Sequence, residues 1–205
     1  MIENHSDRRS KGLPTKLESD RKYIREPAKR IFAQEFRESD LTYKEGEDMY
    51  SPQYLITPTG ARINRLFITG TLIEKEDIGS EVEYWRARIT DPTGVFLVYA
   101  GQYQQEAAEI IATTEPPAFM AVIGKQNLYT TPEETTITSI RPESVQVIDE
   151  ETVDQWIIDT AEQTLKRLQS QNELLQKAVK HYQTDPKKYR EMIATALNAL
   201  NQPDG

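Results

Sequence analysis

RLFITGTLIEKED, at residues 65–77, opens a series of five strand-like segments; the others are VEYWRARITDP (82–92), GVFLVYAG (94–101), AFMAVIGKQNLYT (118–130) and TTITSIRPESVQVID (135–149). In the first segment Leu66, Ile68 and Leu72 alternate with their neighbours, which is the period of a half-buried strand. The segment QYQQEAAEIIATT (102–114) has a helical pattern and separates the third strand from the fourth. The sequence therefore predicts five strands with one helix after the third.

Two glycines and one turn refine this prediction. Gly70 lies near the centre of the first strand and Gly124 late in the fourth. The tetrapeptide Asp-Pro-Thr-Gly at residues 91–94 suits a tight turn that joins the second and third strands as a hairpin. This arrangement predicts an all-β OB-fold, a five-stranded Greek-key barrel, over residues 61–149. In such a barrel the face of strands two and three commonly binds single-stranded nucleic acid.

The composition of the chain limits the chemistry that it can carry. It has 205 residues and no cysteine, so a disulfide framework and a thiolate zinc site are impossible. Its two histidines, His5 and His181, have no second ligand at metal-binding spacing, and we expect no cofactor. No apolar run approaches the roughly 20 residues that cross a bilayer, and the N-terminus lacks the apolar core of a signal peptide. We therefore expect a cytoplasmic protein with no membrane partner.

Charge is distributed unevenly along the chain, whose net charge is −8. Residues 1–30 carry nine Lys or Arg and five Asp or Glu, whereas residues 61–148 carry seven and twelve. We expect residues 1–25 to be a disordered basic tail, either solvated or touching phosphates. An acidic barrel cannot bind nucleic acid through bulk charge. It needs local basic residues and base stacking, or a partner subunit that supplies most of the affinity.

Residues 26–60 are predicted to form a helix and a loop that pack on the barrel. Pro27 suits the first turn of a helix, and Ile31, Phe32 and Phe36 follow it at helical spacing. The remaining segment is predicted to be an ordered loop that ends in a turn at residues 57–60.

Residues 150–205 are predicted to be a helical assembly region. From Glu150 to about Tyr182 there is no Gly or Pro, which predicts one helix of roughly nine turns. Pro186 starts a second helix. Because a long isolated helix is unstable without a partner, its apolar stripe either folds against the second helix or joins helices of other chains. We expect the stripe to be a subunit interface made by Val153, Trp156, Ile157, Ala161, Leu165 and Leu168.

From about Arg62 to Ser170 the chain resembles the archaeal OB-fold proteins associated with replication protein A, and the middle subunit of the eukaryotic complex. The resemblance covers the strand order, the position of the helix and the helix that follows the barrel. One stacking aromatic of that family stands near the end of the third strand, where this chain has Tyr99, and another a few residues after the glycine of the fourth, where it has Tyr129. The resemblance implies binding of single-stranded DNA, in replication, repair or recombination. It also implies a heterotrimer in which the post-barrel helix bundles with the other replication protein A subunits.

Further side chains are placed beside these two aromatics by the strand pattern. Arg86 and Arg88 alternate on the second strand, so they share one face with Tyr84. Lys125 and Arg65 are expected to reach the DNA backbone. The alternative is that Tyr99 caps the core and Tyr129 is an ordinary surface aromatic, while Trp85, on the opposite face of its strand from Arg86, is predicted to be core.

Three classes of function follow. The first is binding of single-stranded DNA through the barrel; the second is an OB-fold scaffold or protein-interaction module with little nucleic-acid binding of its own. The third, an enzyme, is not expected, because the sequence has no Gly-rich phosphate loop, no H-E-x-x-H motif and no nucleophile beside a base.

Overall fold

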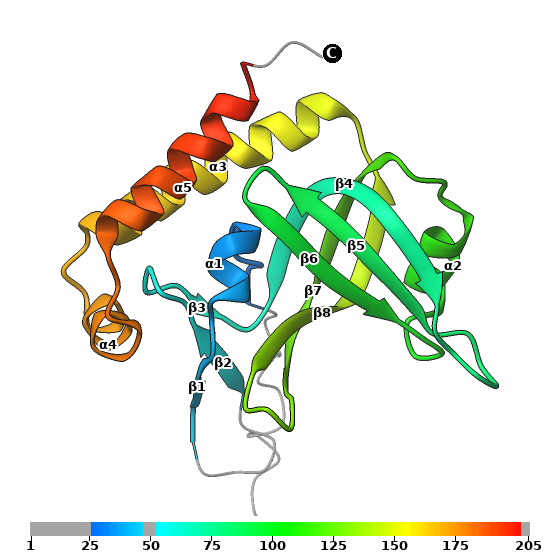
Figure 1. Cartoon of the computed structure of the whole chain (residues 1–205), viewed down its shortest axis with the longest axis horizontal. Helices are drawn as coiled ribbons and strands as arrows, with labels where there is room; N and C mark the ends of the chain where they lie inside the picture. Colours follow the sequence, from blue (N-terminus) through cyan, green and yellow to red (C-terminus); the bar gives the residue numbers. More distant parts are fainter. Residues whose placement is uncertain (1–25, 47–51, 202–205) are drawn as a thin grey trace, which may run out of the picture.

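A computed structural model describes residues 26–46 and 52–201, so the predicted basic tail lies outside the described residues. Figure 1 shows a barrel with α2 on one side and a helical layer of α3 and α5 on the other, with α1 between that layer and the barrel. The elements, in chain order, are α1 (Ala33–Arg37), β1 (Leu41–Lys44), β2 (Gln53–Ile56), β3 (Arg62–Ile63), β4 (Leu66–Asp77), β5 (Trp85–Asp91), β6 (Gly94–Ala100), α2 (Gln105–Thr113), β7 (Ala118–Thr130), β8 (Thr136–Val147), α3 (Glu150–Gln169), α4 (Glu173–Tyr182) and α5 (Pro186–Ala199).

The barrel has the strand order of an OB-fold. Its strands lie in the order β4-β5-β6-β8-β7 and close through antiparallel pairing of β4 with β7. The contact between β6 and β8 is parallel, with Val98 opposite Ile140. All five predicted strands are present, and α2 connects β6 to β7 as predicted. The predicted OB-fold is therefore confirmed.

Side chains at alternate positions of the barrel strands fill the barrel interior. The fully buried apolar side chains come from every barrel strand and include Leu66, Ile68, Leu72, Ala87, Ile89, Phe96, Val98, Met120, Val122 and Ile140. Gly70 lies where a Cβ atom would collide with the carbonyl oxygen of Thr90 on β5, so only glycine allows β4 to bend this closely over its neighbour. Gly124 stands at the middle of β7, at a bulge that follows Ile123, and not late in the strand.

The predicted N-terminal helix is shorter than expected. It begins at Ala33, because the chain around Lys29 is extended and pairs with β4 through a bridge to Leu66. Its first N–H group is capped from outside the helix: the carboxylate of Asp91, in the β5–β6 turn, accepts the N–H of Ala33 at 2.8 Å. Pro27 therefore does not start a helix. Ile31, Phe32 and Phe36 are fully buried in one core with residues of the barrel strands.

The segment predicted to be a loop contains a small sheet. Strand β1 pairs antiparallel with β2, and β2 pairs with β3. The side chain of Tyr182 on α4 explains why β1 is held in place, since its hydroxyl donates to the carbonyl of Ile56 and accepts the N–H of Leu41. The predicted turn at residues 57–60 is present: the N–H of Gly60 donates to the carbonyl of Thr57 at 2.8 Å, and Gly60 has φ +82°.

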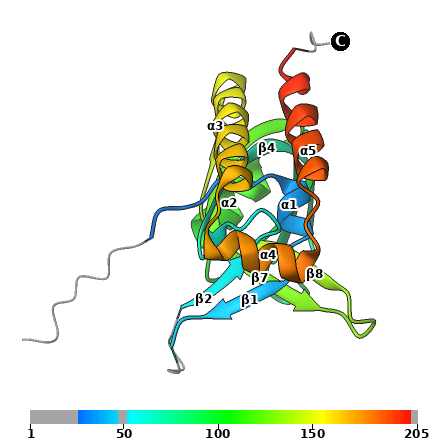
Figure 2. The same ribbon diagram turned by 90° about the vertical axis from the view of Figure 1, so that its left-hand side faces the viewer.

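The predicted nine-turn helix is wrong, because the chain forms two helices there. The backbone is extended at Ser170, and Asn172 caps α4 by accepting the N–H of Leu175 at 2.8 Å. Helix α5 then runs back along α3, as Figure 2 shows, with α4 lying across their ends. Within the described residues, no helix combines the length and the apolar character that crossing a membrane demands.

The predicted subunit interface is buried inside the chain. Val153, Trp156, Ile157 and Ala161 are buried, and Leu165 and Leu168 pack partly against the same core. The ring of Trp156 meets Phe32 edge-on at 5.7 Å, and its indole N–H donates to the carbonyl of Phe67 on β4 at 2.9 Å. Helix α5 covers the stripe with side chains that are themselves buried, Met192, Ile193 and Ala196. Four of the six predicted interface residues are therefore buried within the chain, where they join α3 to the barrel and to α5, and Leu165 and Leu168 are partly exposed.

A buried ion pair joins the helical layer to α1. Glu35 on α1 is fully buried and pairs with Arg167 on α3 at 3.2 Å. Its carboxylate also accepts the hydroxyls of Thr57 and Thr59 at 2.5 Å each. Thr57 and Thr59 lie in the turn after β2. The carboxylate of Glu35 therefore joins three segments of the chain: α1, α3 and this turn.

Candidate nucleic-acid interface

The strand register places five side chains in a row around the outside of the barrel. Glu76 on β4 pairs with Arg86 on β5, which in turn pairs with Tyr99 on β6. Strands β6 and β8 are parallel and Val98 lies opposite Ile140, so the next residues along the two strands, Tyr99 and Arg141, are neighbours on the outer face. Arg141 then pairs with Lys125 on β7. Neighbouring strands lie about 4.8 Å apart, so these groups form one continuous surface.

Burial shows that this row faces outward. Val98 and Ala100, which flank Tyr99, are fully buried, as is Ala87 beside Arg86. Side chains of a strand point alternately to its two faces, so Tyr99 and Arg86 lie on the outer wall. Tyr99 therefore does not cap the core, whereas Trp85, on the inner side of β5, packs against it.

Tyr99 and Tyr84 form a two-ring platform. Their rings are stacked, with centroids 5.9 Å apart and planes inclined by 22°. Tyr84 is 43% exposed and is the more exposed of the two residues. Its position is fixed through Asp77 at the end of β4, whose carboxylate accepts the N–H groups of Tyr84 at 3.0 Å and of Gly79 at 2.9 Å. The hydrogen bond from Tyr84, and to a smaller extent the one from Gly79, lowers the pKa of Asp77. The carboxylate therefore stays ionised at neutral pH and keeps both hydrogen bonds to the loop that carries Tyr84.

The two predicted arginines of β5 are held by acidic neighbours on β4. Arg86 forms an ion pair with Glu76, and Arg88 forms one with Glu74 at 3.3 Å. Both pairs are largely exposed, and exposed pairs contribute only about 0.2–1 kcal/mol each. A phosphate group can therefore compete with either glutamate for its arginine. As long as the pairs persist, however, this part of the face has no net positive charge.

Lys125 and Arg141 are different from these arginines. They are exposed cross-strand neighbours, and within residues 26–46 and 52–201 neither has a carboxylate within 4.0 Å. Arg65 lies next to them, just before β4, but its guanidinium donates to Glu143 at 2.6 Å. The structure thus brings the predicted Lys125 and Arg65 together and leaves only the first of them available.

Tyr129 lies apart from the platform. It is 58% exposed and stands near the end of the β7–β8 arm, opposite Ile137. It is four residues beyond Lys125 on β7, or about 14 Å along an extended strand. The two predicted stacking aromatics therefore do not share one binding position; Tyr129 belongs to an arm that projects beyond the barrel (Figure 1).

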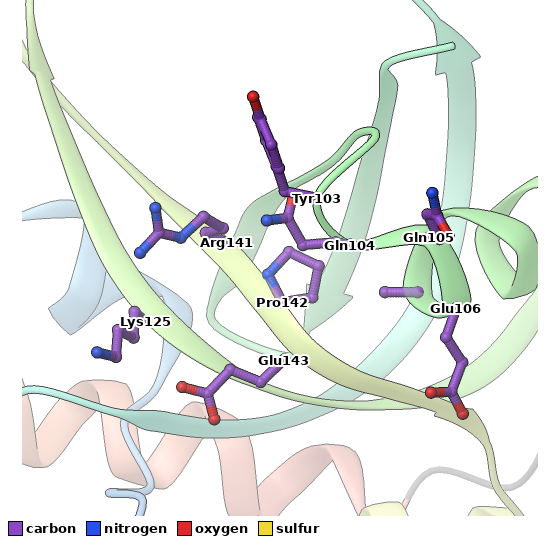
Figure 3. Close-up of a pocket in the computed structure, with 9 residues that line it drawn as sticks. Tyr103, Gln104, Gln105, Glu106, Lys125, Arg141, Pro142 and Glu143 are labelled. Atoms are coloured by element: carbon purple, nitrogen blue, oxygen red, sulfur yellow. The ribbon is translucent and has the colours of Figure 1, made fainter.

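Two residues of this surface were not predicted, Arg141 and Tyr103. The sequence predicts Tyr103 within the helix, but α2 begins only at Gln105, so Tyr103 lies in the preceding turn and is 87% exposed. Both residues line a hollow of about 450 Å³ between α2 and the outer wall (Figure 3). Its other lining residues are Gln104, Gln105, Glu106, Ala107, Lys125, Pro142 and Glu143.

Comparison with known proteins gives likenesses of fold only. No protein-family model matches the chain, and no curated protein matches it. Among solved structures, the chain is similar to one in the S. pombe Stn1-ten1 complex, with 16% identity and a TM-score of 0.47 over 74% of this chain and 96% of that chain.

Two further likenesses are confined to about half of the chain. One is an OBody bound to hen egg-white lysozyme, with 12% identity and a TM-score of 0.36 over 42% of this chain and 80% of that one. The other is asparaginyl-tRNA synthetase from Pyrococcus horikoshii, with 14% identity and a TM-score of 0.35 over 50% of this chain and 26% of that one. Nothing about function follows from these values, and the OB-fold is established by the strand order of the barrel itself.

Proposed function

We propose that this chain is a non-catalytic subunit of a single-stranded-DNA-binding complex of the replication protein A kind, and that its barrel contacts the DNA. The observation that carries the proposal is the row on the outer wall, in which the Tyr84–Tyr99 platform stands between Arg86 on one side and Arg141 and Lys125 on the other. An aromatic platform flanked by cations is the arrangement that single-stranded nucleic acids need.

Each part of the row has a separate task in this proposal. Tyr84 presents an exposed ring face on which a base stacks, and stacking of this kind contributes about 1–3 kcal/mol per base. Arg86, Arg141 and Lys125 lie within one or two strand spacings and neutralise backbone phosphates. Because every base has a stacking face, binding is expected to tolerate any sequence. Duplex DNA hides its bases, so single strands are expected to bind more tightly.

The charge of the chain sets the expected strength of binding. The net charge is −8, and Arg86 and Arg88 must leave Glu76 and Glu74 before they contact phosphate. Binding by this chain alone is therefore expected to be modest. Other subunits of the complex would supply the remaining affinity. Most of the stripe on α3 is buried within the chain, so we expect these subunits to contact another surface.

An alternative function is an OB-fold scaffold that binds proteins and has little affinity for nucleic acid. The neutralisation of Arg86 and Arg88 by Glu76 and Glu74 favours it, since it leaves the strand pair β5–β6 without free cations. The two functions differ in one measurable property, the affinity of the isolated chain for a single strand at low salt.

The experiment that tests the proposal is a fluorescence-anisotropy titration of labelled oligo(dT) with the full chain at low salt. A duplex of the same length serves as the competitor. We expect saturable binding that an unlabelled single strand displaces and the duplex displaces much less. Absence of binding at protein concentrations of hundreds of micromolar, by a chain with the circular dichroism of a folded protein, would refute the proposal in favour of the scaffold.

A further inference from the structure

Lys125 and Arg141 form a pair of like charges directly opposite each other on neighbouring strands. Such a pair destabilises a sheet unless an anion lies between or beside the two groups. Both side chains are exposed, and in the described part of the chain neither forms an ion pair. Their position therefore has a cost for folding that no ion pair in the described part of the chain offsets.

The other cations of the barrel show that this pair is an exception. Residues 61–148 contain twelve acidic residues and seven basic ones. Each of the other five basic residues has a carboxylate partner within 4.0 Å; these are Arg62, Arg65, Lys75, Arg86 and Arg88. With so many acids available, two adjacent unpaired cations indicate a position that is kept for an external anion.

The hollow beside this pair has room for such an anion. It has a volume of about 450 Å³, and its lining includes the uncharged polar side chains of Tyr103, Gln104 and Gln105. Figure 3 shows Arg141 and Lys125 side by side at one end of the hollow, with Glu106 at the other. Glu143, the nearer acid, is already bound to Arg65.

We propose that Lys125 and Arg141 form a phosphate-binding subsite. This inference rests on the proposed function for one point, the source of the phosphate. In that function the phosphate is a phosphodiester of the single-stranded DNA whose base stacks on Tyr84. Arg141 is the neighbour of Tyr99 across the β6–β8 contact, so the subsite lies one strand spacing from the platform. The planar fork of Arg141 suits two phosphate oxygens, and Lys125 adds a second charge.

The test compares wild type with the double variant Lys125→Gln plus Arg141→Gln. The matched control is Lys166→Gln plus Lys187→Gln, which makes the same change in net charge on exposed side chains of α3 and α5. Oligo(dT) with a 5′-hydroxyl and oligo(dT) with a 5′-phosphate are titrated at several salt concentrations. A separate titration follows amide chemical shifts of the full chain with inorganic phosphate as the probe.

Neutralising one phosphate with a cation changes the slope of log K against log[salt] by about 0.7 for single strands, which is about 5-fold in affinity at 0.1 M salt. We therefore expect the subsite variant to lose about 25-fold in affinity at 0.1 M salt and about 1.4 in slope, and the control to lose little. The loss should be equal for both oligonucleotides. Inorganic phosphate should shift the amides around Lys125, Gln104 and Arg141.

The remaining outcomes are also informative. Equal affinity of the subsite variant and wild type, with no amide shifts, would overturn the subsite. A loss confined to the 5′-phosphorylated strand would support a subsite for a terminal phosphate and overturn the phosphodiester source. Localised shifts with phosphate, in a chain that binds neither oligonucleotide, would refute the proposed function while supporting a subsite for a free phosphate group.

Discussion

The ring of Tyr84 stacks on the ring of Tyr99, with 5.9 Å between their centroids and 22° between their planes. Tyr99 lies on β6 and Tyr84 lies in the loop directly before β5, and of the two only Tyr99 is predicted from the sequence to stack on DNA. Tyr84 is the more exposed of the two residues, so in the proposed function it is the ring on which a base stacks, and Tyr99 supports it.

Removing this platform should weaken DNA binding. For Tyr84→Ala plus Tyr99→Ala we expect a loss of about 1–3 kcal/mol in the binding of oligo(dT), because one base loses its stacking partner. The matched control is Tyr84→Phe plus Tyr99→Phe, which keeps both rings and should bind within about twofold of wild type. Fluorescence anisotropy measures both. A double alanine variant that binds as well as wild type, with its fold intact, would show that the platform does not contact DNA.

The position of Tyr84 depends on Gly101, directly after β6. A Cβ atom at residue 101 would lie 2.6 Å from a ring carbon of Tyr84, so Gly101→Ala should push that ring off Tyr99. We expect weaker oligo(dT) binding by about 1 kcal/mol, the lower end of the stacking range. The control is Gly94→Ala at the start of β6, where the nearest neighbour of an added Cβ is 3.5 Å away. If the two variants bind DNA equally, the Tyr84–Tyr99 stack is not needed.

The ion pairs beside the platform, Arg86–Glu76 and Arg88–Glu74, should weaken the binding of DNA. In Glu74→Gln plus Glu76→Gln, Arg88 and Arg86 no longer have a charged partner and become available to phosphate. We expect tighter binding of oligo(dT), by about 0.5–2 kcal/mol for the two exposed pairs. The salt slope should also steepen, by up to about 1.4.

The control for this effect removes the same charge elsewhere. Glu162→Gln plus Glu173→Gln frees Lys166 and Lys177 on the helices, far along the chain from the row. If this control tightens binding as much as the barrel variant, net charge and not release of the two arginines is responsible.

The barrel was predictable from the sequence because its signal is local. Alternation in β4 and the turn at residues 91–94 are present within a few residues of each other, and inward and outward positions follow from strand parity. The same parity correctly placed Arg86 and Tyr84 on one face. Strand parity alone could not show that Arg141 lies beside Lys125. This pairing depends on the register of β7 with β8, which shifts at the bulge beside Gly124.

The predictions from the sequence are wrong where contacts between distant residues outweigh the local preference of the chain for a helix, strand or loop. Leu41 and the rest of β1 are mostly exposed and show no alternation, and Tyr182, far along the chain, holds them in place. The break before α4 contains no Gly or Pro; it depends on the Asn172 cap, which the apolar periodicity on either side conceals. The stripe on α3 was correctly identified as apolar, but only the folded chain shows that α5 and the barrel cover it.

The burial of Trp156 leads to a prediction about the stability of the whole chain. If the C-terminal helices served only assembly, a change in them would leave the barrel unaffected. In the structure Trp156 is buried against Phe32 and donates its indole N–H to the carbonyl of Phe67 on β4. Trp156→Ala should therefore lower the free energy of unfolding of the whole chain by about 3–5 kcal/mol, the usual cost of removing a large aromatic side chain from a core.

Urea denaturation followed by far-ultraviolet circular dichroism measures this change. The control is Ile158→Ala on the same helix, which is 46% exposed and should change the free energy of unfolding by less than about 1 kcal/mol. We expect a single transition for each protein, shifted to lower urea only in Trp156→Ala, because helix and barrel share one core. Two separate transitions, or a Trp156→Ala variant as stable as the control, would mean that the helices are independent of the barrel.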